Sequence, residues 1–280
     1  MLFSSIPFLY YFLPLVLAVY FLVPRGLKNA VLFASSLLFY AWGEPRFCLF
    51  MLLSILQGYV FGRLIEKNAE NRKWSKIFLT ASVLLSLGLL GYCKYADFFI
   101  SSVNAVTGLS LKLLRVALPI GISFYTFQIL SYVVDVYRGD VPAQKSFLKL
   151  GTYIAMFPQL IAGPIVRYAE IAPQLDERET TLEDVSSGAG RFVIGLSKKV
   201  LLANQLIALW NVLRESSAAN GVLGSWVGII AYTLHIYFDF GGYSDMAIGL
   251  GRMFGFEFLK NFDYPYISRS ISEFWRRWHI

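Results

Sequence analysis

Apolar runs that are long enough to cross a membrane recur along the whole chain. A helix needs about 20 mostly apolar residues to span a hydrocarbon core of about 30 Å. Hydrophobic residues make up 56% of the 280 residues and charged residues only 15%, which is well below the charge of a soluble domain, and the mean hydropathy is +0.56. We expect an all-α, polytopic transmembrane helix bundle that forms one membrane domain over residues 1–280. The expected spans are 6–24, 29–43, 46–62, 76–96, 116–137, 188–211 and 222–250.

The positions of Lys and Arg predict which loops face the cytoplasm. Basic residues cluster after the first, third and fifth runs, at Arg25 and Lys28, at Arg63, Lys67, Arg72, Lys73 and Lys76, and at Arg138, Lys145 and Lys149. Because basic loops are retained on the cytoplasmic side, the N-terminus is expected outside. The first run has no basic residue before it and no small-residue cleavage site, so we expect a retained span and no signal peptide. Membrane topology also accounts for the net charge of +7 without a nucleic-acid surface.

Two stretches between the spans are expected to differ from simple loops and helices. Residues 150–171 are apolar but are broken by Pro158, Gly163 and Pro164, which predicts a re-entrant or interfacial element. Within it, the stretch 157–167 ends at Arg167 and could line a tunnel or bind an anionic head group, although an ordinary helix–turn linker is the alternative. Residues 173–186 are polar and are expected to form a loop, with a helix start near Thr181 and Asp184 three residues on.

The last span carries ionisable residues, which are costly inside a membrane and often functional. His235, Asp239 and Asp245 flank the pair Gly241-Gly242. We expect the glycine pair to interrupt the helix and to open a cavity, and we expect His235 to pair with Asp239 four residues on. The alternative is that these residues are structural links between helices, satisfied by Arg or Tyr partners.

The closing segment predicts an interfacial helix that ends in a histidine. Its apolar face would consist of Ile267, Ile271, Phe274, Trp275 and Trp278, opposite Arg269, Glu273, Arg276 and Arg277. His279 would lie at the edge of the apolar face. Trp and Arg at this density suit the bilayer interface, so an anchoring helix with an incidental histidine is one interpretation. The other is that the imidazole accepts a proton from an attacking hydroxyl.

Other kinds of site find no support in the sequence. Cys48 and Cys93 are isolated, so a disulfide framework or a metal site is not expected. No phosphate-binding glycine loop and no nucleophile-elbow serine is present.

The order of several short motifs resembles the membrane-bound O-acyltransferases, in particular the bacterial branch that acetylates alginate and D-alanylates teichoic acid. The resemblance runs nearly end to end. Its motifs are 1–5 (MLFSS), 39–42 (FYAW), 91–95 (GYCKY), 118–127 (LPIGISFYTF), 135–140 (DVYRGD), 157–164 (FPQLIAGP), 237–250 (YFDFGGYSDMAIGL) and 273–279 (EFWRRWH).

The resemblance implies a helix bundle with a tunnel, in which an acyl group from a cytoplasmic donor reaches an acceptor hydroxyl outside. The donor would be a substrate such as acetyl-CoA or an acyl carrier, with no tightly bound cofactor and no metal. The acceptor would be an exported polysaccharide, handled with an extracytoplasmic acyltransferase partner at the bacterial cytoplasmic (inner) membrane, among membrane lipids. D-alanyl transfer to teichoic acid is the alternative acyl transfer. A transporter or flippase is the alternative from another class.

The resemblance also implies roles for single residues. His279 would be the first of two characteristic histidines, and the second, further along in an apolar segment, is commonly taken as the principal catalytic one. The supporting or tunnel residues would be Trp278, Arg276, Arg277, Asp239, Asp245 and Arg167. The sequence ends at Ile280, before a second histidine. We therefore expect an N-terminal fragment, truncated at the C-terminal side, that has no transferase activity by itself.

Overall fold

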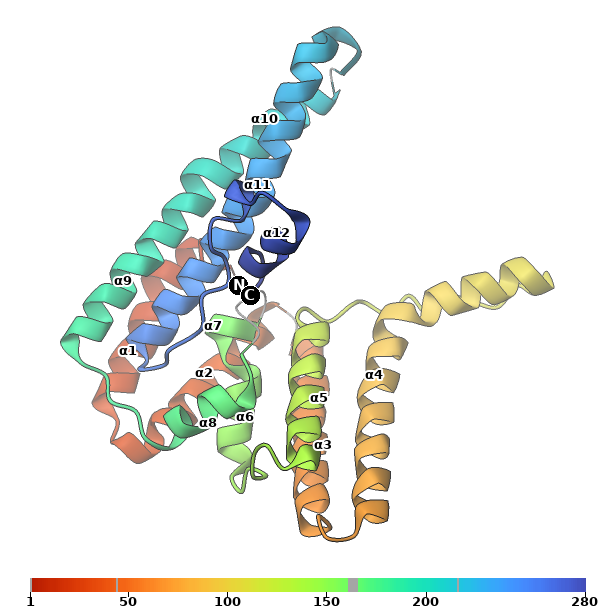
Figure 1. Ribbon diagram of the computed structural model, residues 1–280, viewed down its shortest axis with the longest axis vertical. Helices are drawn as coiled ribbons and strands as arrows, with labels where there is room; N and C mark the ends of the chain where they lie inside the picture. The colour runs from red at the N-terminus through yellow and green to blue at the C-terminus, as the bar shows by residue number, and fades with distance from the viewer. Residues whose placement is uncertain (1, 44, 161–165, 216) are drawn as a thin grey trace. The chain divides into compact units, whose positions relative to one another are not determined.

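The computed structural model describes residues 2–43, 45–160, 166–215 and 217–280, and every regular element among them is a helix. The chain forms two compact units (Figure 1). The terminal unit contains Met1–Leu22 and Glu177–Ile280, and the middle unit contains most of Val23–Asp176. The prediction of a single membrane domain stays a prediction.

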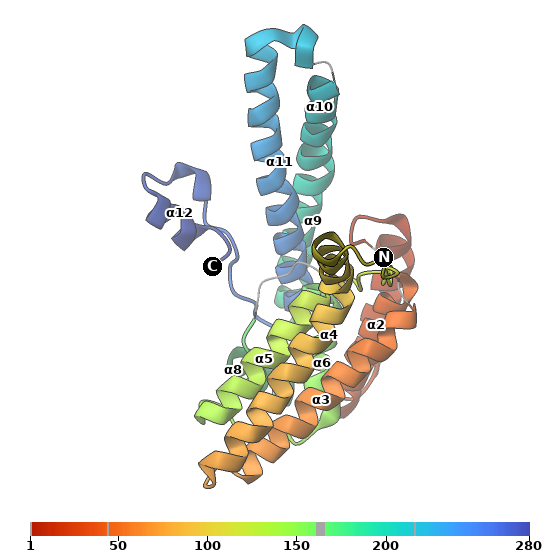
Figure 2. The ribbon, with the colours of Figure 1, turned by 90° about the vertical axis from the view of Figure 1, so that its right-hand side faces the viewer.

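The middle unit is built around three neighbouring helices. Figure 2 shows α3, α4 and α5 side by side, and each of them contacts the other two. Gly62 in α3 faces the ring of Tyr132 in α5, where a Cβ atom would lie 2.7 Å from the tyrosine hydroxyl. The helices of this unit are α2 (Lys28–Gly43), α3 (Cys48–Lys67), α4 (Arg72–Thr107), α5 (Ile122–Arg138), α6 (Phe147–Ala155), α7 (Phe157–Leu160) and α8 (Tyr168–Asp176), with 3₁₀ turns η2 (Arg25–Leu27) and η3 (Pro45–Phe47).

The terminal unit is built around a long antiparallel helix pair. One member runs through α9 (Leu182–Ser197), the π-helical segment η4 (Lys198–Ala203) and α10 (Asn204–Glu215), and it packs along α11 (Ser217–Met253). The N-terminal segment joins this pair through aromatic contacts, because Phe3 stacks on Tyr243 with ring centroids 4.8 Å apart. The remaining elements are η1 (Phe8–Phe12), α1 (Leu13–Leu22), η5 (Pro265–Ile267) and α12 (Ile271–Arg277).

Four of the described helical stretches are long and apolar enough to cross a membrane, namely Pro45–Lys67, Arg72–Thr107, Leu182–Glu215 and Gly221–Met253. They confirm the predicted spans 46–62, 76–96, 188–211 and 222–250. The predicted span 6–24 corresponds to the shorter apolar helix Phe8–Leu22, and 29–43 corresponds to the 16 residues of α2. The chain is therefore a multi-pass membrane protein with an all-helical fold.

The predicted span 116–137 was wrong at its N-terminal end. The helix α5 begins only at Ile122, because Gly121 adopts φ +75° and approaches the backbone of Leu160 too closely for a Cβ atom, 2.9 Å from the carbonyl oxygen. The preceding segment is irregular and is held by the carboxylate of Asp97, which accepts hydrogen bonds from the backbone N–H groups of Leu114 (2.7 Å) and Arg115 (2.9 Å).

The predicted loop 173–186 was also too long. The helix α8 continues through Pro173 to Asp176, so only residues 177–181 lie between α8 and α9. The expected helix start is confirmed, because Thr181 and Asp184 form a reciprocal capping box. The predicted break in 150–171 is present at Met156, where ψ is 111° between α6 and α7. Gly163 and Pro164 lie outside the described residues.

Glycines determine how closely α9 approaches α11. A Cβ atom on Gly195 would lie 2.5 Å from the carbonyl oxygen of Gly242, and one on Gly249 would lie 2.5 Å from that of Gly188. The two glycines of each helix are seven residues apart, or about two helical turns, so the two contacts lie on one face of each helix. Small residues at such positions allow membrane helices to pack backbone against backbone.

Substituting Gly195 tests this contact. We expect Gly195→Ala to lower the free energy of unfolding by about 1–3 kcal/mol, because the added methyl group must push the helices apart. The measurement is the unfolding midpoint of the detergent-purified chain. Gly190→Ala on the same helix is the matched control, since its Cβ would meet nothing within 4 Å and Ala favours a helix. Equal effects of the two substitutions would contradict the proposed packing.

Candidate active site

The C-terminal helix is shorter than the sequence predicts. The helix α12 covers only Ile271–Arg277, and Trp278 leaves it in an extended conformation. Ser270 caps the helix, with its hydroxyl accepting a hydrogen bond from the N–H of Glu273 at 3.1 Å. Ile267 lies outside the helix, in η5. The expectation of one helical face from Ile267 to His279 was therefore wrong at both ends.

A backbone pairing with residues 261–263 ends the helix. The N–H of Asp263 donates to the carbonyl of Arg277 at 2.9 Å, and Phe262 forms an antiparallel bridge with Trp278. The N–H of Ile280 then donates to the carbonyl of Asn261 at 3.0 Å. This pairing competes with the next helical turn for the same backbone groups, which is why the helix does not reach His279.

His279 lies in this paired segment with a fixed environment. Its backbone has φ +56°, an uncommon conformation for a residue other than glycine. Its Nδ1 atom lies 2.7 Å from Oδ1 of Asn261, and its ring packs against Phe240 with centroids 5.3 Å apart. Desolvation by the surrounding groups lowers the pKa of His279 below its ordinary value. The imidazole is thus neutral at pH 7 and has a nitrogen available to accept a proton.

The other predicted residues of this segment support its shape. Arg277 Nε donates to Glu273 Oε1 at 3.0 Å, and its guanidinium also lies 3.7 Å from Asp263. Trp278 stacks on Phe274 with centroids 5.5 Å apart. Arg276 is exposed. Arg277 and Trp278 thus hold the segment in place, whereas the Arg276 side chain faces solvent.

The two aspartates of α11 face the helix beside them. Asp245 forms ion pairs with Arg191 (3.1 Å) and Lys198 (2.6 Å), and Asp239 forms one with Lys199. The structure thus supports structural links between helices, with Lys and Arg as partners.

Two expectations for this part of α11 were wrong. The Nδ1 atom of His235 lies 2.9 Å from the carbonyl oxygen of Ala203, so His235 meets the neighbouring segment η4 in place of Asp239. The helix also continues through Gly241 and Gly242 without a break, and its hydrogen bonds stay intact. Gly242 instead allows the close approach of α9.

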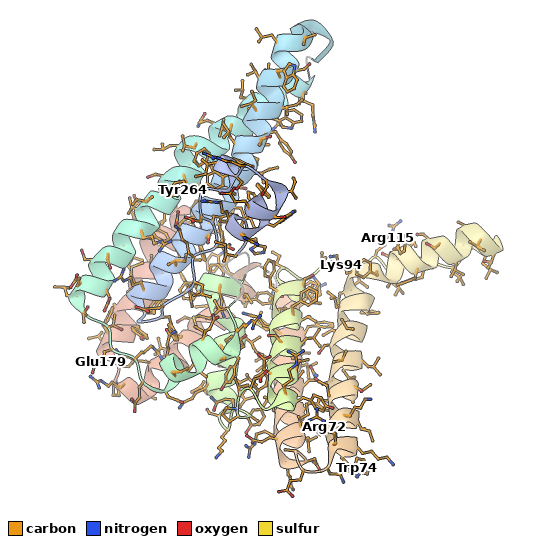
Figure 3. The ribbon with its side chains drawn as sticks, in the orientation of Figure 1. Arg72, Trp74, Lys94, Arg115, Glu179 and Tyr264 are labelled. Carbon is orange, nitrogen blue, oxygen red and sulfur yellow. The ribbon has the colours of Figure 1, made fainter. Side chains whose placement is uncertain are left out.

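A cavity of about 260 Å³ lies between α9, α11 and the segment 260–264 of the terminal unit. Tyr264, labelled in Figure 3, and Lys260 come from that segment, and Tyr237 comes from α11. Asn261 lines the cavity and also contacts His279, so the cavity and the histidine share one residue. Further lining residues are Arg191, Ile194, Lys198, Gly241, Ser244, Asp245, Ile248 and Phe262.

The sequence predicts only part of this arrangement. Asp245 lines the cavity, and Arg277, Trp278 and His279 form the paired segment beside it. Asn261 and Ser244 were missed, since nothing in their spacing links them to His279. Arg167 belongs to the middle unit, where it is exposed one residue before α8, and its role in binding a head group stays a prediction.

Comparison with known proteins places the chain in a family. The model of the membrane-bound O-acyltransferase family matches residues 141–280, which is half of the chain and includes α9, α11 and the paired C-terminal segment. The chain belongs to this family. The expected resemblance is thereby confirmed.

Some relatives match over the whole chain and others over part of it. A probable alginate O-acetylase from Pseudomonas syringae pv. tomato is 44% identical over 285 residues, covering 100% of this chain and 55% of the relative. A peptidoglycan O-acetyltransferase from Helicobacter pylori is 30% identical, covering 100% of this chain and 59% of the relative. A teichoic acid D-alanyltransferase from Bacillus subtilis is 27% identical over 58% of this chain and 42% of the relative. The chain thus spans just over half the length of the relatives that match all of it.

Removing the carboxylate of Asp245 tests the ion pairs beside the cavity. We expect Asp245→Asn to lower the free energy of unfolding by about 1–3 kcal/mol, because two partly buried cations lose their partner. Asp239→Asn is the matched comparison and should cost less, since the Asp239 side chain is 38% exposed against 18% for Asp245. Chemical unfolding in detergent measures both. If Asp239→Asn costs as much as Asp245→Asn, burial does not determine the strength of these pairs.

Proposed function

We propose that this family member transfers an acyl group, most simply an acetyl group, to hydroxyls of an exported cell-surface polysaccharide. The observation that carries the proposal is the placement of His279 beside a cavity lined with basic and aromatic side chains. Backbone pairing holds the segment that carries His279, and Asn261 holds its neutral imidazole. Family membership supports acyl transfer as the class of reaction. The identity of 44% to a probable alginate O-acetylase supports acetyl as the group and a polysaccharide as the acceptor.

The proposed chemistry uses His279 as the general base. Its unprotonated nitrogen takes the proton of an acceptor hydroxyl while the hydroxyl oxygen attacks the carbonyl carbon of an acyl thioester. The tetrahedral intermediate then collapses, the C–S bond breaks, and the thiolate leaves and takes up a proton. The products are an O-acyl ester and a free thiol. The donor would be acetyl-CoA or an acyl carrier, used as a substrate, and no tightly bound cofactor is needed.

The setting of the reaction is part of the proposal. We place the chain in the cytoplasmic membrane of a bacterium, where it would take the acyl group from inside and pass it to an acceptor outside. An extracytoplasmic acyltransferase would be a partner in the transfer to the polymer. D-alanyl transfer to teichoic acid is a second candidate, favoured by the match to the Bacillus subtilis D-alanyltransferase, but at lower identity and over less of the chain. A transporter loses one of its supports, because the helix is unbroken at Gly241 and Gly242.

The test uses membranes that contain this chain fused to the part of the Pseudomonas syringae relative that lies beyond the matched region. We expect His279→Gln to lower the transfer of labelled acetyl groups to polysaccharide by about 10²–10⁴-fold, because the proton acceptor is lost. His235→Gln is the matched control and should retain transfer, since the Nδ1 atom of His235 meets the backbone carbonyl of Ala203 in the neighbouring segment η4 and its ring lies beside Tyr232. Transfer that survives His279→Gln would remove His279 from the mechanism. Transfer of D-alanine in place of acetate would favour the second candidate.

The pH dependence of transfer provides a separate prediction. A general base works in its neutral form, so the rate should rise with pH through the pKa of His279 and then level off. Because partial burial lowers that pKa below 6.5, we expect the half-maximal rate below pH 6.5 and a plateau at pH 7. Initial rates of the fused protein between pH 5 and pH 8 measure this. A rate that still rises steeply above pH 7 would identify a different base.

A further inference from the structure

Asn261 is the side chain in closest polar contact with the imidazole of His279, and it is far more buried than the histidine. Only 1% of the surface of Asn261 is exposed to solvent. Its Oδ1 atom lies 2.7 Å from Nδ1 of His279, and its backbone carbonyl accepts the N–H of Ile280 at 3.0 Å. Asn261 therefore holds both the ring and the backbone of the segment that carries His279.

The hydrogen-bonding chemistry of this contact determines the tautomer. A carboxamide oxygen can only accept a hydrogen bond, so Nδ1 of His279 must carry the proton. In a neutral imidazole the other nitrogen, Nε2, is then unprotonated and basic. Fixing one ring nitrogen by a hydrogen-bonded neighbour is a general way to orient a catalytic histidine.

The rest of the Asn261 side chain argues against a purely structural role. Its Nδ2 atom is buried and has no hydrogen-bond partner among the described residues. A buried donor without a partner costs about 1–3 kcal/mol, which an apolar side chain of similar size would avoid. The Oγ atom of Ser244, which lines the same cavity, is likewise buried and without a partner in the described part of the chain. The site thus contains two buried polar atoms without a hydrogen-bond partner in the described part of the chain.

We propose that Asn261 is a positioning residue for His279, which holds the imidazole in the Nδ1-protonated tautomer and presents Nε2 as the base. The catalytic consequence rests on the proposed function of His279. The tautomer itself is a property of the chain and can be measured without any substrate.

The chain contains only two histidines, which makes a direct measurement possible. The other, His235, has its Nδ1 atom 2.9 Å from the backbone carbonyl oxygen of Ala203, which cannot act as a donor. His235 is thus an internal reference for an Nδ1-protonated ring. The experiment labels both histidine rings with ¹⁵N in the detergent-purified chain and records their spectra between pH 5 and pH 8.

We expect the spectrum of His279 to match the Nδ1-protonated pattern of His235. In Asn261→Leu the pattern of His279 should shift toward Nε2 protonation, while that of His235 stays unchanged. In Asn261→Asp the Nδ1 proton should remain, and the titration midpoint of His279 should rise by about 1 pH unit because of the added negative charge. An Nε2-protonated His279 in the unaltered chain, or a pattern that does not respond to Asn261→Leu, would overturn the proposal.

Stability and transfer measurements separate positioning from folding. We expect Asn261→Leu to keep or raise the unfolding midpoint, because it removes the unpartnered Nδ2 group, while transfer by the fused protein falls by about 10-fold or more. Asn261→Asp should restore much of the transfer, with the pH profile moved upward as in the spectra. A parallel loss of folding and transfer in Asn261→Leu, without rescue by Asn261→Asp, would indicate a structural role and reject the proposal.

The two proposals can fail separately. If His279→Gln abolishes transfer but Asn261→Leu changes neither the tautomer nor the rate, then Asn261 does not position the base and the proposed function stands. If the tautomer responds to Asn261 as expected but His279→Gln leaves transfer unchanged, then the contact is real and His279 is not the base.

Discussion

The close approach of α9 to α11 is the contact on which the terminal unit depends. Two glycines on each helix let the backbones meet where any side chain would hold them apart. In a membrane, where apolar side chains gain little by leaving lipid, such close packing supplies much of the attraction between helices. The same approach places Asp245 within reach of Arg191 and Lys198 and forms two walls of the cavity.

The carboxylates of α11 pair with cations from a segment of the neighbouring helix that is π-helical and not α-helical. The segment η4 is π-helical, and its two consecutive lysines, Lys198 and Lys199, bind Asp245 and Asp239 on the neighbouring helix. The carbonyl of Ala203 at the end of η4 also faces His235. Short π-helical segments are frequent near functional sites, because they redirect side chains and carbonyl groups. Here the segment supplies the cations that pair with the two aspartates on α11.

The candidate base lies outside these helix contacts. His279 follows a short helix and is held by a backbone pairing with residues 261–263, by Asn261 and by the ring of Phe240. This arrangement carries the candidate base on a different segment from the ion pairs, although Asp245 and Lys198 also line the cavity. The aspartates stabilise the helix pair, whereas a neutral histidine with one fixed ring nitrogen is left beside the cavity.

The sequence by itself determined the membrane class, four of the spans, the capped start of α9 and the family, because apolar length, capping residues and ordered motifs are local properties. It did not determine the role of Gly241-Gly242, since glycine permits both a helix break and a close helix contact, and only the neighbouring helix decides which occurs. It also misplaced His279, because helical periodicity assumes that the helix continues. Only the tertiary structure decided that the helix ends at Arg277, since residues 261–263 take the backbone hydrogen bonds that a further turn would need.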